Sequence, residues 1–291
     1  MSDLRMREPE TRPAHLDWDF GDFPYGLEPL LMPVAGQPAA AASLPGLLPA
    51  ADIARTLAAL DLPPGGSGAA PADDTDTLYW FRWITGHQVT MLLWHLMTEL
   101  AAGAAETGAA DERTLAHLEA CTDGYTAMLD YTGSCPPEIY RTLIRPRMYL
   151  HHRAFSGLWA ADFVPLRRLL RGQRPPWMAG PSGNRLSAAV ARSRTQHEVV
   201  AARLVPAGAS LLQQSAATTA VRPTPRTAAL FDSFFLTARA LVGRDAVVAQ
   251  LLHRVRAVAL DLAANGCGGP TATGEIVASL RRVVAYAGST R

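Results

Sequence analysis

The sequence predicts an all-α fold, in which a single helical domain follows an extended N-terminal arm. Long segments place apolar residues at helical spacing behind Asp, Thr or Asn caps. No segment alternates apolar and polar residues over the length of a strand, and no hairpin dipeptide separates two β-branched runs. A chain of 291 residues, 48% of them hydrophobic, can bury a substantial core without disulfides.

The predicted arm covers residues 1–50, and the predicted helical domain covers residues 51–291. The arm is rich in proline and shows neither helical nor strand periodicity. Its segment DWDFGDFPYG contains four aromatic residues, Trp18, Phe20, Phe23 and Tyr25. These residues are too apolar for a free tail, so we expect the arm to dock on the body or on a neighbouring subunit.

The longest predicted helix runs from about residue 74 to 106, because Asp and Thr stand in front of it as caps and no proline lies inside it. A short helix at about 51–60 and the breaker-rich linker LPPGGSGAAPADD precede it. Later helices are expected at about 111–131, 137–159 with an interruption at Pro146, 163–171, 184–205, 224–242, 244–264 and 273–286.

The charged residues exclude several classes of enzyme. All 27 Lys and Arg positions are arginine, so the chain contains no lysine. Chemistry that needs a primary amine is therefore excluded, including Schiff bases, pyridoxal phosphate lysines and the P-loop and kinase lysines. A net charge of +1 gives no basic surface for nucleic acid. No run of about 18 apolar residues predicts a membrane span.

Cysteine use and the N-terminus indicate the cellular compartment. Cys121, Cys135 and Cys267 are widely spaced and form no C-x-x-C pattern, which fits a reducing environment. The first residues are polar and acidic, whereas a secretion signal is basic and then apolar. The sequence therefore predicts a cytoplasmic protein.

His87 lies in an aromatic stripe of the longest predicted helix. Tyr79, Trp83, His87 and Met91 recur every four residues and share one helix face. Such a stripe is typical of core packing, and it equally fits a pocket in which aromatic rings surround an imidazole. His95 is rotated from His87 by about 80°, and Met91 occupies the position that a zinc pair with His87 would need.

His197 occupies a slot in the stripe of the helix predicted at 184–205. The stripe consists of apolar or small residues, Leu186, Val190, Ser193, Val200 and Leu204. His197 is therefore expected to face inward, either as a core histidine or as a ligand. Two inward histidines on different helices, with no carboxylate motif beside them, suit a haem slot with one imidazole on each side of the iron.

Other clusters carry weaker signals. His117 and Cys121 are four residues apart, which fits ordinary packing, a metal pair or attachment of haem through one thioether. Four arginines precede the segment FSGLWAADF, namely Arg141, Arg145, Arg147 and Arg153. One of them is a candidate for binding a carboxylate through two hydrogen bonds.

Three segments together carry a family resemblance. WFRWITGHQVTMLLWHLMTEL resembles the distal helix of the tryptophan dioxygenases, RAFSGLWAADF resembles their Ser-Gly-Phe-Gln-Ser segment, and RTQHEVVAARLV resembles their proximal helix. His197 and Arg203 match the spacing of the ligand histidine and a following arginine. The family's Gln-Ser and Arg are replaced by Trp159, Ala160 and Val164, and PAGASLLQQ replaces a Gly-Thr-Gly-Gly loop. The pattern SGLWAADFVPLRRL, the FPYG arm and the short length look more like the haem-dependent aromatic oxygenases, above all the bacterial L-tyrosine hydroxylases of pyrrolobenzodiazepine, lincosamide and hormaomycin pathways.

This resemblance implies haem b bound by His197 and an all-α fold like that of the tryptophan dioxygenases. It also implies hydroxylation of L-tyrosine to L-DOPA in bacterial secondary metabolism, with hydrogen peroxide, or dioxygen and a reductant, as oxidant. His87 would act as acid and base or orient the phenol, Trp83 would contact the substrate ring, and Arg145, or next Arg141, would bind its carboxylate. A homo-oligomer is expected, with a dimer favoured. The alternatives are a tryptophan or indole oxygenase, a non-catalytic haem-binding protein and a cofactor-free interaction module.

Overall fold

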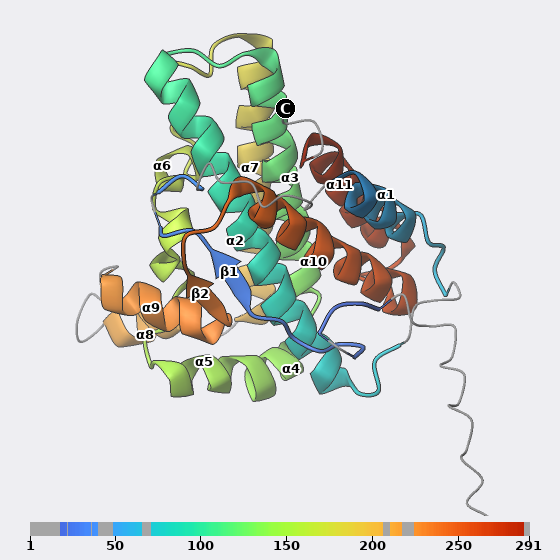
Figure 1. The fold of residues 1–291 in the computed structure, drawn as a ribbon. Coiled ribbons are helices and arrows are strands. Elements are labelled where there is room, and N and C mark those ends of the chain that lie inside the picture. The colour runs from blue at the N-terminus through green and yellow to red at the C-terminus, as the bar shows by residue number, and fades with distance from the viewer. Residues whose placement is uncertain are drawn as a thin grey trace, which may run out of the picture.

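The computed structural model describes residues 18–21, 23–35, 37–39, 49–65, 71–205, 210–216 and 224–287. It confirms the predicted all-α class and forms a single helical domain (Figure 1). The α-helices are α1 (Pro49–Leu60), α2 (Thr75–Thr107), α3 (Glu112–Gly133), α4 (Pro137–Ile139), α5 (Arg145–His151), α6 (Arg167–Leu170), α7 (Gly180–Leu204), α8 (Leu211–Ala216), α9 (Pro225–Phe234), α10 (Arg244–Asn265) and α11 (Pro270–Ala287).

Helix α2 is the centre of the fold. It packs against α3 and α10, while α3 also contacts α7 and α11, and α1 lies along α10. Asp74 caps its first turn by accepting a hydrogen bond from the Thr77 amide, and Gly108 ends it with a left-handed φ of 71°. Between residues 81 and 97 nearly every side chain is buried, as expected for a helix surrounded by other elements.

The helix predicted at 224–242 is wrong in its second half. Helix α9 ends at Phe234, and the chain then forms strand β2 (Thr237–Arg239), which pairs in parallel with β1 (Leu30–Met32). Leu236 has a φ of 53°, in the left-handed region that a branched side chain disfavours, so the helix cannot continue through it. Three-residue strands are too short to show alternation, which explains why the sequence pattern did not reveal them.

Pro146 does not interrupt its helix. A π-helical turn (Tyr140–Ile144) joins α4 to α5, and the Arg145 amide donates to the Tyr140 carbonyl five residues earlier. The wider turn accommodates the proline in the first turn of α5. Short 3-10 turns (Gly157–Trp159 and Ala161–Phe163) then replace the predicted continuation of the helix to residue 159.

The aromatic residues of the arm dock on the body, as predicted. Trp18, Phe20 and Tyr25 are buried and form a small core with Phe81 of α2 and residues of α10. Phe23 differs, because 63% of its surface is exposed. Residues 1–17, 22, 36 and 40–48 of the arm lie outside the described residues, and the domain boundary at residue 50 stays a prediction.

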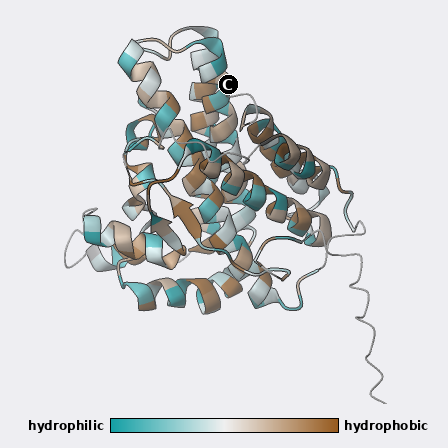
Figure 2. Ribbon diagram, viewed as in Figure 1, coloured by the Kyte–Doolittle hydropathy of each residue, from teal (hydrophilic) through white to brown (hydrophobic). Residues whose placement is uncertain are grey.

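The helices carry both hydrophobic and hydrophilic residues (Figure 2). Among the described helices, none has both the length and the apolarity that crossing a bilayer would require.

Candidate functional site

The imidazole of His87 lies between aromatic rings on α2. Its centroid is 4.5 Å from that of Trp83 and 4.4 Å from that of Phe235, with which it stacks at an interplanar angle of 16°. Nδ1 is 2.6 Å from the Trp83 carbonyl oxygen. Because a carbonyl only accepts, Nδ1 carries the proton and Nε2 keeps its lone pair. Among the described residues, none forms a hydrogen bond with Nε2.

Burial lowers the pKa of His87 to about 4, against the opposing effect of the hydrogen bond to Trp83. The imidazole is therefore neutral near pH 7. Beside it, the indole Nε1 of Trp83 is buried and donates to no group in the described part of the chain. A basic nitrogen and an unpaired donor thus lie side by side in the aromatic stripe.

Arg145 lies near this pair, but Arg141 does not. The Trp83 ring is 5.7 Å from Tyr140, and burial raises the pKa of Tyr140 against the effect of its hydrogen bond with Arg145. Arg145 also donates to Gln214 at 3.0 Å. The Arg141 side chain is 69% exposed and pairs with Glu138 at 2.6 Å on the helix surface, and its role in binding the substrate stays a prediction.

His197 lies on α7 and is exposed, so the inward orientation predicted for it is wrong. The face of α7 that packs against α3 instead contains Ser193, Gln196 and Val200. His197 follows Gln196 and is rotated from it by about 100°, which places it at the edge of the stripe. Desolvation still lowers its pKa, against the effect of Glu198. The described residues form no hydrogen bond with its ring, so a neutral nitrogen is available.

Two glycines bring the histidine-bearing helices to the same end of α3. A Cβ at Gly86, beside His87, would lie 2.4 Å from Thr132, and a Cβ at Gly133 would lie 2.7 Å from Val200, three residues after His197. Both helices therefore cross the last turn of α3 at close range. The described residues show no direct contact between the two imidazoles.

His117 and Cys121 lie in the core between α3 and α11. The His117 ring stacks on Tyr286 at 5.2 Å, and burial lowers its pKa to about 4. Cys121 is fully buried, which raises the pKa of its thiol to about 12. This arrangement fits the packing interpretation. In the described part of the chain, no three His, Cys, Asp or Glu side chains gather as a metal-ion site.

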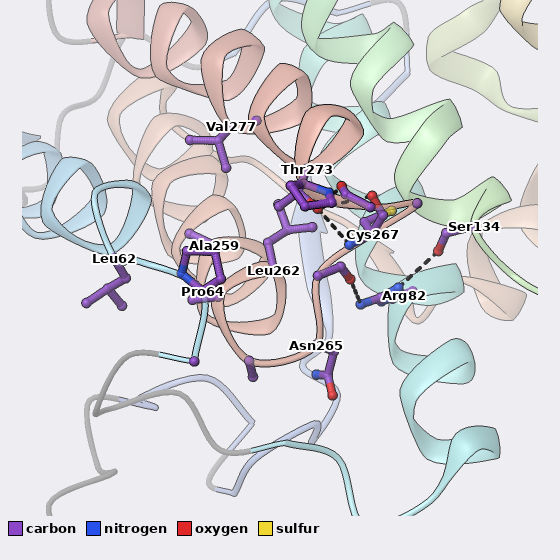
Figure 3. Close-up of a pocket in the computed structure, with 18 of the residues that line it drawn as sticks. Leu62, Pro64, Arg82, Ser134, Ala259, Leu262, Asn265, Cys267, Thr273 and Val277 are labelled. Carbon is purple, nitrogen blue, oxygen red and sulfur yellow. Dashed lines mark hydrogen bonds between the residues drawn. The ribbon is translucent and has the colours of Figure 1, made fainter.

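The sequence analysis did not predict a buried charged network that joins α2 to α3 and α10. Arg82 Nε and Nη2 donate to both carboxylate oxygens of Asp261 at 2.7 and 3.3 Å, and the Tyr131 hydroxyl donates to Asp261 at 2.8 Å. Arg82 also donates to Ser134 and to the Gly266 carbonyl (Figure 3). Arg82 and Asp261 lie 179 residues apart in the sequence, so local spacing contained no signal for their pairing.

The network borders a cavity of about 690 Å³ between α1, α2, α10, α11 and the loop at 266–269 (Figure 3). His87, His197 and Arg145 do not line it. Of the polar side chains at its wall, Arg82, Ser134, Asn265 and Thr273 are hydrogen-bonded within the protein. The cavity therefore contains none of the chemistry of the histidine sites.

The fold and these contacts define an all-helical protein with a histidine-based candidate active site on its central helix. The family model described as SfmD 3-methyl-L-tyrosine peroxygenase matches residues 32–194, which is more than half of the chain. The chain belongs to this family. The match includes His87, Trp83, Arg141 and Arg145, whereas His197 follows it. Among curated proteins, no match was found.

The family confirms the predicted class of enzyme, a peroxygenase that acts on a tyrosine derivative. The resemblance to the L-tyrosine hydroxylases themselves stays a prediction.

Proposed function

We propose that this protein is a haem-dependent peroxygenase that hydroxylates the ring of L-tyrosine ortho to the phenol, giving L-DOPA, with a ring-methylated tyrosine as the alternative substrate. The observation that carries the proposal is the neutral His87, with an available Nε2, beside the unpaired indole donor of Trp83. The chain belongs to a family described as a peroxygenase of a tyrosine derivative. This membership supports both a tyrosine-type ring as the substrate and peroxide as the oxidant.

The available donors fit haem better than a bare metal ion. Haem needs as little as one imidazole from the protein, whereas a structural or catalytic ion needs three or more ligands, which the described residues do not gather. His197 has a neutral imidazole without a hydrogen bond from the described residues, and we propose it as the iron ligand. When bound, haem would supply the iron at which peroxide is cleaved.

The proposed reaction balances without an external reductant. One peroxide oxygen forms a bond to the ring carbon, and the other leaves as water with both peroxide protons. The hydrogen displaced from the ring becomes the proton of the new hydroxyl group. His87 Nε2 accepts a proton from peroxide and returns it to the departing oxygen, which requires the neutral form of the imidazole. Trp83 contacts the aromatic ring of the substrate, and Arg145 binds its carboxylate.

The direct test supplies purified protein with hydrogen peroxide and, in separate reactions, L-tyrosine, 3-methyl-L-tyrosine and L-tryptophan. A catechol product that carries one oxygen from labelled peroxide is expected from a tyrosine. A ring-opened product from tryptophan would favour the indole oxygenase, and a coloured protein without turnover would favour a haem-binding protein. A colourless preparation would contradict the haem proposal.

His87→Gln should lower turnover of the preferred substrate by about 10²- to 10⁴-fold, the usual contribution of a positioned acid and base. Its haem spectrum should be retained. Met91→Leu, one turn later on the same stripe, changes volume little and serves as the matched control. Turnover of His87→Gln at the parental rate would remove the proton-transfer role.

Arg145→Ala should raise KM for the amino acid by about 10- to 100-fold and leave kcat nearly unchanged, because the lost ion pair binds ground state and transition state alike. Tyramine lacks the carboxylate, so its KM should not change. Arg141→Ala, from the exposed pair with Glu138, is the control. An equal effect of Arg145→Ala on tyrosine and tyramine would contradict the assignment.

A further inference from the structure

The ring that stacks on His87 belongs to a strained turn. Phe235 lies between the end of α9 and β2, and the next residue, Leu236, has a φ of 53°. A leucine is strained in this left-handed region, so the conformation persists only where its surroundings enforce it.

The surroundings that enforce it are attached to α2 beside His87. Gln88 is fully buried, and its Nε2 donates at 2.9 Å to the Phe235 carbonyl and to the Glu28 carbonyl. The Leu30 amide donates to the Leu236 carbonyl at 2.8 Å. The turn is therefore held from two sides, by the central helix and by the docked arm.

Gln88 is itself held in place, because Arg254 of α10 donates from Nε to its Oε1 at 2.9 Å. Phe235 is 1% exposed, and the rings of Phe231 and Phe234 support it at 4.7 and 5.0 Å. The ring that covers His87 thus has little freedom to move away.

We propose that Phe235 is a positioning residue for His87, which holds the imidazole in one plane with Nδ1 on the Trp83 carbonyl and Nε2 available to the reactants. The inference rests on the proposed role of His87 in proton transfer and extends it to a residue from a distant part of the chain. An imidazole without this cover would rotate, and its two tautomers would exchange.

Few ionisable groups face this imidazole. Tyr140 contacts the Trp83 ring rather than the imidazole, and Arg145 is hydrogen-bonded to Tyr140. Arg254 donates a hydrogen bond to Gln88. Within the described ranges, no charged side chain contributes to the pKa of His87, which burial alone lowers. Removal of the stacked ring should therefore admit water and move the pKa back towards its ordinary value of about 6.5.

The test compares Phe235→Leu and Phe235→Ala with the matched control Phe234→Leu, which loses a ring of the same cluster that does not touch His87. The full-length protein carries nitrogen-labelled histidine and is kept diamagnetic, as the ferrous carbonyl form if it purifies with haem. NMR then reports the tautomer and titration of His87, assigned with His87→Gln.

The parent and Phe234→Leu should show a single Nδ1–H tautomer at pH 7. Phe235→Leu should show a mixture of tautomers, and Phe235→Ala should also raise the pKa of His87 by about 1–2 units. An unchanged tautomer and titration in both Phe235 variants would overturn the inference.

Turnover separates this inference from the proposed function. In Phe235→Ala, the acid limb of the pH profile of kcat/KM should shift to higher pH together with the pKa of His87. The reason is that protonated His87 cannot accept a proton. If the NMR titration of His87 shifts but the acid limb of the pH profile of kcat/KM does not, the positioning role of Phe235 is supported and the role of His87 in turnover is contradicted.

Discussion

The His197→Ala protein should purify without haem. Its Soret absorbance and its iron content per chain should fall about tenfold or more, because haem b has no covalent link and depends on its axial ligand and apolar surroundings. His197 suits this role through its available neutral nitrogen on α7. Optical spectra and a pyridine haemochrome assay on equal amounts of protein measure the loss.

His253→Ala is the control for this experiment. The His253 imidazole is also partly exposed, but its Nε2 is hydrogen-bonded to the Asp19 carbonyl at 2.9 Å. Normal haem in His197→Ala, or loss of haem only in His253→Ala, would overturn the ligand assignment.

The thioether alternative at Cys121 has a separate outcome. Acid extraction with an organic solvent should remove all haem from the parent protein. Haem that stays with the chain, and is released in Cys121→Ala, would show covalent attachment instead. The fully buried thiol beside the stacked His117 favours complete extraction.

Asp261→Ala should destabilise the protein strongly. It leaves Arg82 and the Tyr131 hydroxyl buried without their partner, and breaking such a pair costs about 3–5 kcal/mol. In the parent, burial lowers the pKa of Arg82 and Asp261 raises it above its ordinary value. An arginine side chain stays protonated in proteins even without such a carboxylate, so the variant retains a buried charge without its partner. A domain has about 5–15 kcal/mol of stability in total, so a large part of it would be lost.

Urea unfolding followed by circular dichroism measures this change. Arg82→Met combined with Asp261→Leu should recover much of the loss, because it removes both charges from the core. Arg141→Ala should leave the midpoint unchanged, because its ion pair is solvated. A midpoint for Asp261→Ala equal to that of the parent would show that water or a shifted side chain replaces the missing carboxylate.

Local patterns were sufficient for the long helices and for part of the site. The caps Asp74 and Asp111 and the apolar spacing behind them mark α2 and α3 to within two residues. The interval of four residues also placed Trp83 and His87 on one face, where their rings now lie 4.5 Å apart. Both results depend on neighbours within one or two helical turns, which a single segment contains.

The remaining contacts depend on distant segments. Phe235 reaches His87 only because β2 pairs with the arm and Gln88 binds the turn. His197 is exposed because the stripe that meets α3 passes through Gln196 and Val200. An apolar spacing identifies the buried side of a helix only approximately, and the partner helix then selects which residues it covers.

By itself the sequence determined the helical class, the exclusion of amine chemistry through the missing lysines and the place of the candidate His87 in an aromatic stripe of one helix. These follow from composition and from the geometry of one helix. Only the tertiary structure decided that a ring from a strained turn covers His87 and that Arg145, rather than Arg141, lies near it. It also decided that Arg82 and Asp261 form a buried pair. The physical reason is that burial and pairing are properties of surfaces that meet across the fold, and residues far apart in the chain supply those surfaces.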